Sequence, residues 1–521
     1  MVLKAFALLF SCLMVYSASL HSQMLSEVAL FKRCYGQLTG RPVPLGHALM
    51  QDVKIRKINA LEACYSILDK TELNPSSGLL TAGDDIEAQW TLNNLNSFHR
   101  SWFSGNAVEQ IQGYNDELGV GTRNIYDMNE PGLALTRAFF VKDGRYSDVL
   151  TLSSGVHGIR MDNGFVRRLI GWTVSFPGRS NYGNHLERDR NLFNFSALSG
   201  GFDGNSDTTN SLFADLPKIE TGELKGIRLT TENMIIPNLS LHPLAVTKRG
   251  NEQPGLNFSF NLFQTQGGGI LGSPSYVLSN FGHPLGLEMN GQTKLPRRWA
   301  RSAMETFMCA TLPALRESDV RQFLKVGSTA RFRNSTSCLQ CHANLDQMAY
   351  TARNTVLSGT DFSSLSAGSK GYSHVGYVAA TYRAELPSVD GWPSEPVENF
   401  HRQTPSGKLY FRSFSGELKD IPVIGISGLG AAMATTDDFY QCASKRYFEF
   451  LTGITVALYD RKDPRYSELN KQLTSEAIAD RSFVESLAVD LRKNQSPKQI
   501  LKKIIASKYY RSANFRPAGD Q

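Results

Sequence analysis

Cys338, Cys341 and His342 form a C-x-x-C-H motif within STSCLQCHANLDQMAY, residues 335–350. Thiols at this spacing stand about one helical turn apart, which suits addition to the two vinyl groups of haem. The histidine that follows can then ligate the iron. The motif predicts one covalently attached haem c per chain, with Cys338 and Cys341 binding the cofactor and His342 binding the metal.

Three other uses of a C-x-x-C pair compete with this interpretation. Structural zinc needs four ligands, and the chain has no second C-x-x-C pair to supply them. A thioredoxin-like redox pair follows a strand early in a βαβ unit, whereas this motif lies past residue 330, in a Ser/Asn-rich turn before a predicted helix. A disulfide between Cys338 and Cys341 would leave an envelope binding or scaffold protein that binds no haem, and this stays the alternative function.

The sequence leaves the sixth iron ligand open. Met348 lies only six residues beyond His342, which makes it an awkward ligand for the opposite face of the ring. His374, His401 and Met433 are farther along the chain, and an open site is a further alternative. No Ser/His/Asp or paired-carboxylate signature stands out, so the motif indicates an electron carrier or a haem oxidoreductase without assigning catalytic residues.

The N-terminus has the pattern of a secretory signal. Lys4 is followed by an apolar run over 5–16 and by the small residues Ser17, Ala18 and Ser19. The run is too short for a comfortable transmembrane helix. We therefore expect a signal peptide over 1–19 and a periplasmic or cell-envelope location. A lipid anchor at Cys12 and a buried N-terminal helix are the alternatives.

Export would also decide which cysteines remain to form disulfides. Cleavage at Ser19 would remove Cys12 from the seven, and haem attachment would use two more. The last four, enough for two disulfides in an oxidising compartment, allow three connectivities that spacing does not rank. Cys34 and Cys64 share the N-terminal region, which leaves Cys309 with Cys442 by elimination, unless some of these thiols stay free and buried.

Composition places the chain among ordinary globular proteins. Its 521 residues are 41% hydrophobic and 20% charged, and a length of this size suggests roughly three domains. The net charge of +7 is spread along a long chain, and no nucleic-acid-binding signature is present. We predict no nucleic-acid partner, no transmembrane span and an unidentified redox partner protein, and we leave peripheral or lipid-anchored membrane association open.

Apolar periodicity predicts a mainly α fold. Helical patterns run through 24–75, 88–103, 130–150, 296–313, 435–453 and 496–512. Thr436 or Asp437 is a candidate N-cap and Gly453 a helix stop. Ser496 and Gln499 suggest a capping box, with Pro497 at the first helical position. Segments 374–384 and 408–414 read as short strands, and Gly267, Gly268 and Gly269 as a tight turn rather than a phosphate-binding loop.

These elements give a multi-helix framework with a cytochrome c-like haem segment and an irregular, partly β excursion. The predicted regions after the signal peptide are an N-terminal helical domain at 20–154, an irregular Gly/Asn-rich region at 155–295, a haem-attachment segment at 296–356, short strands and loops at 357–425, and a C-terminal helical domain at 426–521.

The final hundred residues also carry a run of basic side chains without an acid among them. This run fits either a solvated helix face or a docking surface for an acidic redox partner or an anionic envelope surface. Its members are Arg492, Lys493, Lys498, Lys502, Lys503, Lys508 and Arg511.

The motif segment resembles the planctomycete-type cytochrome C-like family, exported proteins built from several domains of unknown function. In that family a Ser-rich lead-in precedes C-x-x-C-H, and a hydrophobic-Asp-Pro step follows. Here the step is Leu345-Asp346-Gln347, without the proline. Stretches at 35–44, 130–150, 405–418, 428–453 and 500–512 resemble other parts of these proteins in the same order. The resemblance implies a largely helical c-type cytochrome and carries over only Cys338, Cys341 and His342.

Overall fold

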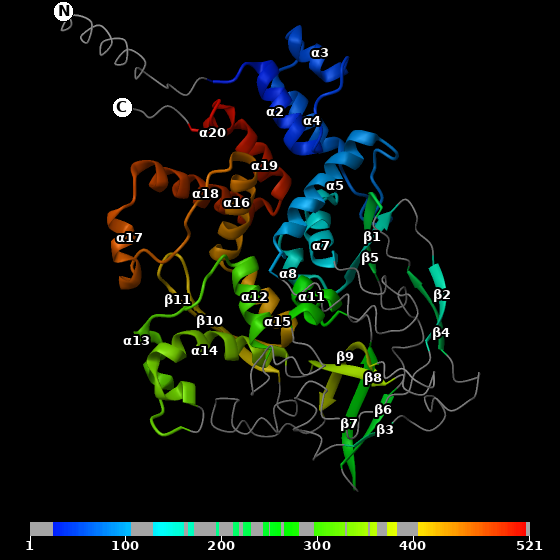
Figure 1. The fold of residues 1–521 in the computed structure, drawn as a ribbon, viewed down its shortest axis with the longest axis vertical. Helices are drawn as coiled ribbons and strands as arrows, with labels where there is room; N and C mark the ends of the chain where they lie inside the picture. The colour runs from blue at the N-terminus through cyan, green and yellow to red at the C-terminus, as the bar shows by residue number, and fades with distance from the viewer. Residues whose placement is uncertain are drawn as a thin grey trace, which may run out of the picture.

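The computed structural model is mainly helical, and its five-stranded sheet lies at the end away from the two termini (Figure 1). It describes residues 24–105, 129–160, 165–170, 194–196, 212–217, 222–230, 243–248, 251–261, 265–280, 296–328, 331–352, 355–361, 372–382 and 405–516. The predicted signal peptide, Cys12 and His401 lie outside these residues. The mainly α prediction is confirmed.

The helices fall into an N-terminal, a central and a C-terminal group. The N-terminal group is α2 (Glu27–Thr39), α3 (Ala48–Lys54), α4 (Ala60–Lys70), α5 (Ile86–Ser101), α7 (Glu130–Phe140) and α8 (Asp148–Thr151). The central group is α11 (Pro274–Asn280), α12 (Arg297–Phe307), α13 (Glu317–Val320) and α14 (Thr336–Ala349). The C-terminal group is α15 (Gly425–Met433), α16 (Asp437–Thr452), α17 (Ser467–Lys471), α18 (Ser475–Asn494), α19 (Pro497–Ala506) and α20 (Lys508–Arg511).

Short 3-10 helices and strands complete the described chain. The 3-10 helices are η2 (Gly269–Gly272), η3 (Arg321–Phe323), η4 (Arg331–Asn334), η5 (Tyr350–Ala352) and η7 (Pro464–Tyr466). The strands are β1 (Gly155–Arg160), β2 (Phe165–Ile170), β3 (Asn194–Ser196), β4 (Leu212–Pro217), β5 (Leu224–Thr230), β6 (Pro243–Lys248), β7 (Asn251–Asn261), β8 (Thr355–Asp361), β9 (Tyr372–Tyr382), β10 (Ser406–Arg412) and β11 (Leu418–Ile424).

All pairings among these strands are antiparallel. β1 pairs with β5, β2 with β4 and β10 with β11, while a larger sheet has the order β3-β6-β7-β9-β8. β9 and β10 fall on the two segments whose alternation predicts strands. The partly β excursion contributes β1 to β7, and its β7 joins β9 from beyond the motif helix. The sheet therefore links the regions before and after the motif.

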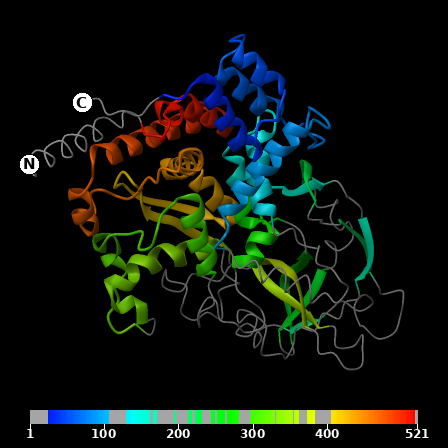
Figure 2. The ribbon, with the colours of Figure 1, turned by 45° about the horizontal axis from the view of Figure 1, so that its top comes forward.

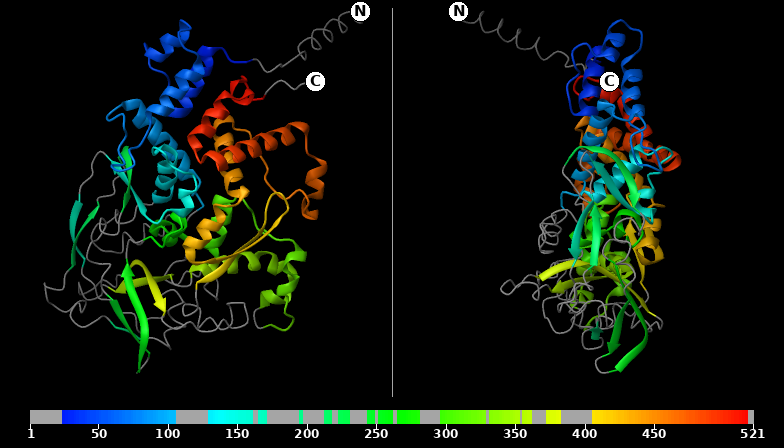
Figure 3. Two further views of the ribbon diagram at one scale, coloured as in Figure 1. Left: turned by 180° about the vertical axis from the view of Figure 1, so that it is seen from behind. Right: turned by 90° about the vertical axis from the view of Figure 1, so that its right-hand side faces the viewer.

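The two ends of the described chain close into one helical group, opposite the five-stranded sheet (Figures 2 and 3). The Arg33 guanidinium of α2 donates to the backbone carbonyls of Tyr510 and Ser512, both at 2.7 Å. Lys502 of α19 pairs with Asp69 of α4 at 2.6 Å. These contacts span more than 400 residues of sequence and join the first and last helices of the described chain.

Local signals set the ends of several helices as the sequence predicts. Gly453 ends α16 with a left-handed backbone, φ 69°. Thr436 holds the N-cap position of α16, but its hydroxyl donates to the Met433 carbonyl at 2.7 Å and does not cap the helix. Ser496 caps α19 by accepting from the Gln499 backbone N–H, with Pro497 in the first turn. The reciprocal Gln499 half of the predicted capping box is not part of the observed cap.

The glycine run at 267–269 forms a tight turn between packed segments. All three residues have positive φ, between 58° and 75°. A Cβ atom on Gly268 would lie 2.6 Å from the Ile426 carbonyl oxygen, and one on Gly269 would overlap the Val149 carbonyl. The turn therefore needs glycine both for its backbone conformation and for close approach to α8 and α15.

Helix α12 packs its apolar stripe into the main core. Ala300, Ala303, Met304 and Phe307 are buried, as is Met308 directly after the helix. This core also takes residues from the N-terminal helices, from α14 and from the C-terminal helices. The region boundaries predicted from sequence therefore remain predictions, because the described segments on both sides of them share packed side chains.

Much of the C-terminal basic run is engaged within the molecule. Lys502 pairs with Asp69, Lys503 with Asp490 and Arg492 with Asp437. Lys498 is held over the Phe140 ring and donates to the Thr71 carbonyl at 3.3 Å, and burial lowers its pKa. The acids that neutralise these bases come mostly from other elements, so the run is not one uniform docking surface.

No helix within the described ranges combines the length and the apolar character needed to cross a bilayer.

Two disulfides tie distant elements together, with the pairing that elimination favours. Cys34 of α2 bonds to Cys64 of α4, and their Cα atoms lie 6.1 Å apart. Cys309, just after α12, bonds to Cys442 of α16 with a Cα separation of 5.2 Å. All four side chains belong to tightly packed regions, and the second bond connects the central and C-terminal helices.

We expect replacement of both Cys34 and Cys64 by Ser to lower the free energy of unfolding by about 3–4 kcal/mol, because the bond closes a loop of sequence separation 30. Urea unfolding of the haem-free protein measures this loss. The matched control is Cys338→Ser with Cys341→Ser, which removes two cysteines that form no disulfide. An equal loss in both double variants would contradict the expectation.

The buried Asp438 carboxyl should make the stability of the folded protein depend on pH. It is 2% exposed and accepts the Phe414 backbone N–H at 2.8 Å, and burial raises its pKa to about 7. The pKa of Asp in an unfolded chain is about 3.9. The folded state therefore holds the proton of Asp438 more tightly than the unfolded state does. The stability from this group is complete below about pH 4 and is lost as the pH rises to about 7.

Asp438→Asn should remove this dependence, because the amide stays neutral and can still accept from Phe414. The free energy of unfolding of the variant, minus that of the unchanged protein, should therefore rise between pH 4.5 and pH 8. Urea unfolding at several pH values tests this. A difference that stays constant across the range would show that Asp438 does not titrate there.

Candidate cofactor-attachment site

The C-x-x-C-H motif lies in the first two turns of α14, which begins after Ser335. Cys338 is exposed and Cys341 is half-buried, and both are free thiols. The opposite side of the helix is anchored: Leu339 and Ala343 are buried, and the Asn344 side chain donates to the Tyr410 carbonyl at 2.7 Å. The packing of α14 thus leaves the two thiols on its more open side, one turn apart.

The His342 side chain is held by two contacts. Its ring stacks on Phe332, with centroids 4.2 Å apart and planes 9° apart. Its Nδ1 lies 3.4 Å from Oδ2 of Asp346, one turn farther along α14. Within the described part of the chain, Nε2 makes no hydrogen bond. The ring is therefore oriented through Nδ1, and Nε2 is the nitrogen left for a metal.

Asp346 is fully buried and bound to Arg297 of α12. The guanidinium donates through Nε to Oδ1 at 2.5 Å and through Nη2 to Oδ2 at 2.9 Å. Burial alone would raise the pKa of the Asp346 carboxyl, but Arg297 and His342 outweigh it and hold that pKa below its usual range. Asp346 is therefore a carboxylate, and it links the motif helix to α12.

The setting of the motif differs from that of a thioredoxin-like redox pair. The motif helix α14 follows the 3-10 helix η4 within the described residues, whereas a thioredoxin-like pair follows a strand. Burial raises the pKa of the Cys341 thiol, although the charges of Arg465 and Arg301 act in the opposite direction.

Neither methionine proposed as sixth ligand is available at this site. Met348 and Met433 are both fully buried in the main hydrophobic core. His374 lies on β9, where only the strand pairing is described, and His401 falls outside the described residues. His99 is also committed, because its two ring nitrogens bond to Thr136 and Tyr447 at 2.9 Å and 3.0 Å. A ligand from these described side chains would require repacking of the core.

The described residues contain no group of three or more His, Cys, Asp or Glu side chains placed to hold a metal ion. A structural zinc site of four protein ligands is therefore not present in this part of the chain.

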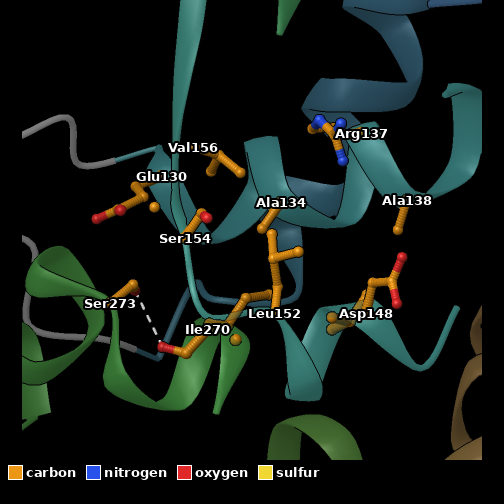
Figure 4. A pocket seen from close by; sticks show the side chains of 13 residues that line it. Glu130, Ala134, Arg137, Ala138, Asp148, Leu152, Ser154, Val156, Ile270 and Ser273 are labelled. Atoms are coloured by element: carbon orange, nitrogen blue, oxygen red, sulfur yellow. Dashed lines mark hydrogen bonds between the residues drawn. The ribbon is translucent and has the colours of Figure 1, made fainter. Parts of the chain in front are cut away.

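A small pocket between α7, α8 and η2 is not a second candidate site (Figure 4). Its volume of about 20 Å³ has room for about one water molecule. The Glu130 carboxylate at its edge accepts the Ser275 backbone N–H at 3.1 Å. Burial raises the pKa of Asp148 and lowers that of Arg137 on its walls. A pocket of this size is too small for a cofactor or a substrate.

Sequence reasoning identified the two cysteines and the histidine but missed their supports. Asp346 appeared only as part of the family-like Leu345-Asp346-Gln347 step. The position of Asp346 four residues after His342 could have predicted their contact, since side chains at this spacing lie on one face of a helix. Arg297 and Phe332 gave no local signal, because their contacts depend on how α12 and η4 pack against α14.

Comparisons with protein-family models, with curated proteins and with solved structures found no match. The resemblance to planctomycete-type cytochrome C-like proteins therefore remains an expectation from the sequence.

We expect a single substitution in the Arg297–Asp346 pair to destabilise the fold more than joint substitution of both residues. Asp346→Ala should destabilise the fold by about 3–5 kcal/mol, because it leaves a mostly buried guanidinium without its partner. Joint replacement by Arg297→Met and Asp346→Leu should cost much less, because both charges are removed together. Urea unfolding of the three proteins measures the difference, and a double variant as unstable as Asp346→Ala would refute the account.

Proposed function

We propose that this protein is an exported monohaem c-type cytochrome-like protein that transfers electrons in the bacterial cell envelope. The observation that carries the proposal is the state of the cysteines. Cys338 and Cys341 are free thiols one turn apart at the start of α14, whereas the other four described cysteines form disulfides. The two thiols are thus the ones left for covalent attachment of a cofactor.

The residues around the motif fit a haem. The Cys338 and Cys341 thiols would each form a thioether with a vinyl group, an addition that needs neither an oxidant nor a reductant. His342 would ligate the iron through Nε2, because Asp346 holds Nδ1. A carboxylate on the far ring nitrogen orients a histidine ligand and raises its basicity. When bound, the haem supplies one-electron redox chemistry.

The two disulfides support the proposal that the protein is exported to an oxidising compartment. Bonds such as Cys34–Cys64 and Cys309–Cys442 are typical of exported proteins and rare in the cytosol. Cytochrome c maturation also takes place outside the cytoplasm, so an exported chain meets the machinery that a C-x-x-C-H motif requires.

Covalent attachment is the direct test. The full chain, exported in a bacterial host that expresses cytochrome c maturation proteins, should retain haem on a denaturing gel and give a c-type spectrum. Cys338→Ala with Cys341→Ala should abolish the haem stain. His342→Ala should keep residual attachment at the cysteines but alter the ferrous spectrum, because the iron loses its protein ligand.

Cys34→Ser with Cys64→Ser provides the matched control, because it removes the same number of cysteines away from the motif and should retain the haem stain. Absence of covalent haem in the unchanged chain would overturn the proposal. The alternative, an envelope binding or scaffold protein with a Cys338–Cys341 disulfide, would then show no free thiols after export, which alkylation and mass spectrometry detect.

A further inference from the structure

The α3 tip, which we define as residues 41–58, lies at the outer end of the N-terminal helices. Figures 1 and 3 show α3 beyond α2 and α4, at the end of the molecule away from the five-stranded sheet. Every residue of the tip belongs to the described chain. This position leaves one side of α3 open to contact with something outside the protein.

The inner side of α3 is fixed to the rest of the N-terminal helices. Met50 and Val53 are buried in the main hydrophobic core. Nε2 of His47, just before the helix, contacts Oε1 of Glu87 on α5. The His47 ring also lies edge-on to Tyr35 of α2, with centroids 5.2 Å apart. The helix is therefore held in one orientation, with its other side facing away from the core.

Two large apolar side chains stand in solvent at the two ends of α3. Leu45, before the helix, is 105% exposed, the highest value among the described large apolar side chains. Ile55, the C-cap residue, is 71% exposed. They bracket a helix of seven residues, which is about 10 Å long. The tip thus offers apolar contacts that the described chain does not use, and burying them elsewhere would be favourable.

The same tip is basic, with Asp52 as its one acid and four bases: Arg41, Lys54, Arg56 and Lys57. Asp52 pairs with Lys57 at 3.3 Å. Lys54 and Arg56 are exposed, and neither forms an ion pair within the described chain. Two unpaired bases therefore stand on either side of Ile55 in the sequence.

Two acids beside the start of α4 are committed to that helix. Glu62 accepts the Asn59 backbone N–H at 2.8 Å, and Glu27 of α2 accepts the Ala60 backbone N–H at 2.6 Å. Since neither acid pairs with a base of the α3 tip, the tip keeps its positive charge.

We propose that the α3 tip docks the protein on an anionic lipid surface. Leu45 and Ile55 would enter the boundary between headgroups and acyl chains, while Lys54 and Arg56 contact the anionic headgroups. A lipid surface fits this composition better than an acidic protein does. Protein interfaces are depleted in lysine, and their strongest contacts come from Trp, Tyr and Arg, whereas residues 41–58 contain no Phe, Tyr or Trp. The proposal needs no haem.

Vesicle binding of the full chain tests the proposal. The chain is exported from a bacterial host, so that every variant carries the same N-terminus. It is mixed with vesicles of phosphatidylcholine alone or of phosphatidylcholine with phosphatidylglycerol. Hydrogen–deuterium exchange then reports on the tip itself, whatever the N-terminus contributes to binding. Anionic vesicles should slow the exchange of backbone amides over 44–58, and neutral vesicles should not.

Two double variants separate the charges from the apolar contacts. Lys54→Gln with Arg56→Gln should weaken binding of the tip to anionic vesicles about tenfold or more, because two bases near the surface are lost. Leu45→Ser with Ile55→Ser should weaken it by about tenfold or more, because the apolar contacts are lost.

The matched control is Leu469→Ser with Lys471→Gln. It removes an exposed apolar side chain and an exposed base from α17, and it should leave the slowing over 44–58 unchanged. No slowing on anionic vesicles, equal slowing on both kinds of vesicle, or unchanged slowing in both tip variants would overturn the proposal. Equally tight binding to soluble polyglutamate that survives Leu45→Ser with Ile55→Ser would also overturn it, since the tip would then recognise an acidic protein.

Discussion

The buried pair between Arg297 and Asp346 is the contact on which the motif depends. Burying two charges is costly, and the cost is offset here by two direct hydrogen bonds from the guanidinium to the carboxylate. Because Arg297 belongs to α12, whose apolar stripe is fixed in the main core, the pair sets the position and rotation of α14. Asp346 then holds Nδ1 of His342, so the orientation of the candidate iron ligand is set by the core of the protein.

The state of the cysteines places a second constraint on the chain. An exposed thiol at Cys338 one turn from Cys341 is reactive in the same oxidising conditions that favour Cys34–Cys64 and Cys309–Cys442. A chain that kept both thiols after export would face oxidation or exchange with its own disulfides. Conversion of both sulfurs to thioethers removes this hazard. The proposed attachment therefore accounts for the redox chemistry of all six described cysteines.

Local features were predictable from sequence, and long-range ones were not. Gly453, Ser496 and Pro497 act within one helical turn, so their roles at the ends of α16 and α19 could be read directly. The motif spacing likewise predicted two thiols about one helical turn apart, although the sequence placed them in a turn before the helix and the structure places them within α14. Arg297 reaches Asp346 across 49 residues, and Lys502 reaches Asp69 across 433. Such contacts follow from packing of whole elements, which is why the final basic run looked unpaired in sequence and is largely neutralised in the fold.

On the proposed function, the contacts of the motif also bear on the redox behaviour of an attached iron. The Asp346 carboxylate, acting through His342, would favour the oxidised state by raising the basicity of the iron ligand. The Arg297 guanidinium, which binds the same carboxylate, would offset part of this effect, since positive charge near a low-dielectric site stabilises the added electron. Arg297 would therefore both hold α14 in place and moderate the charge that reaches the iron ligand.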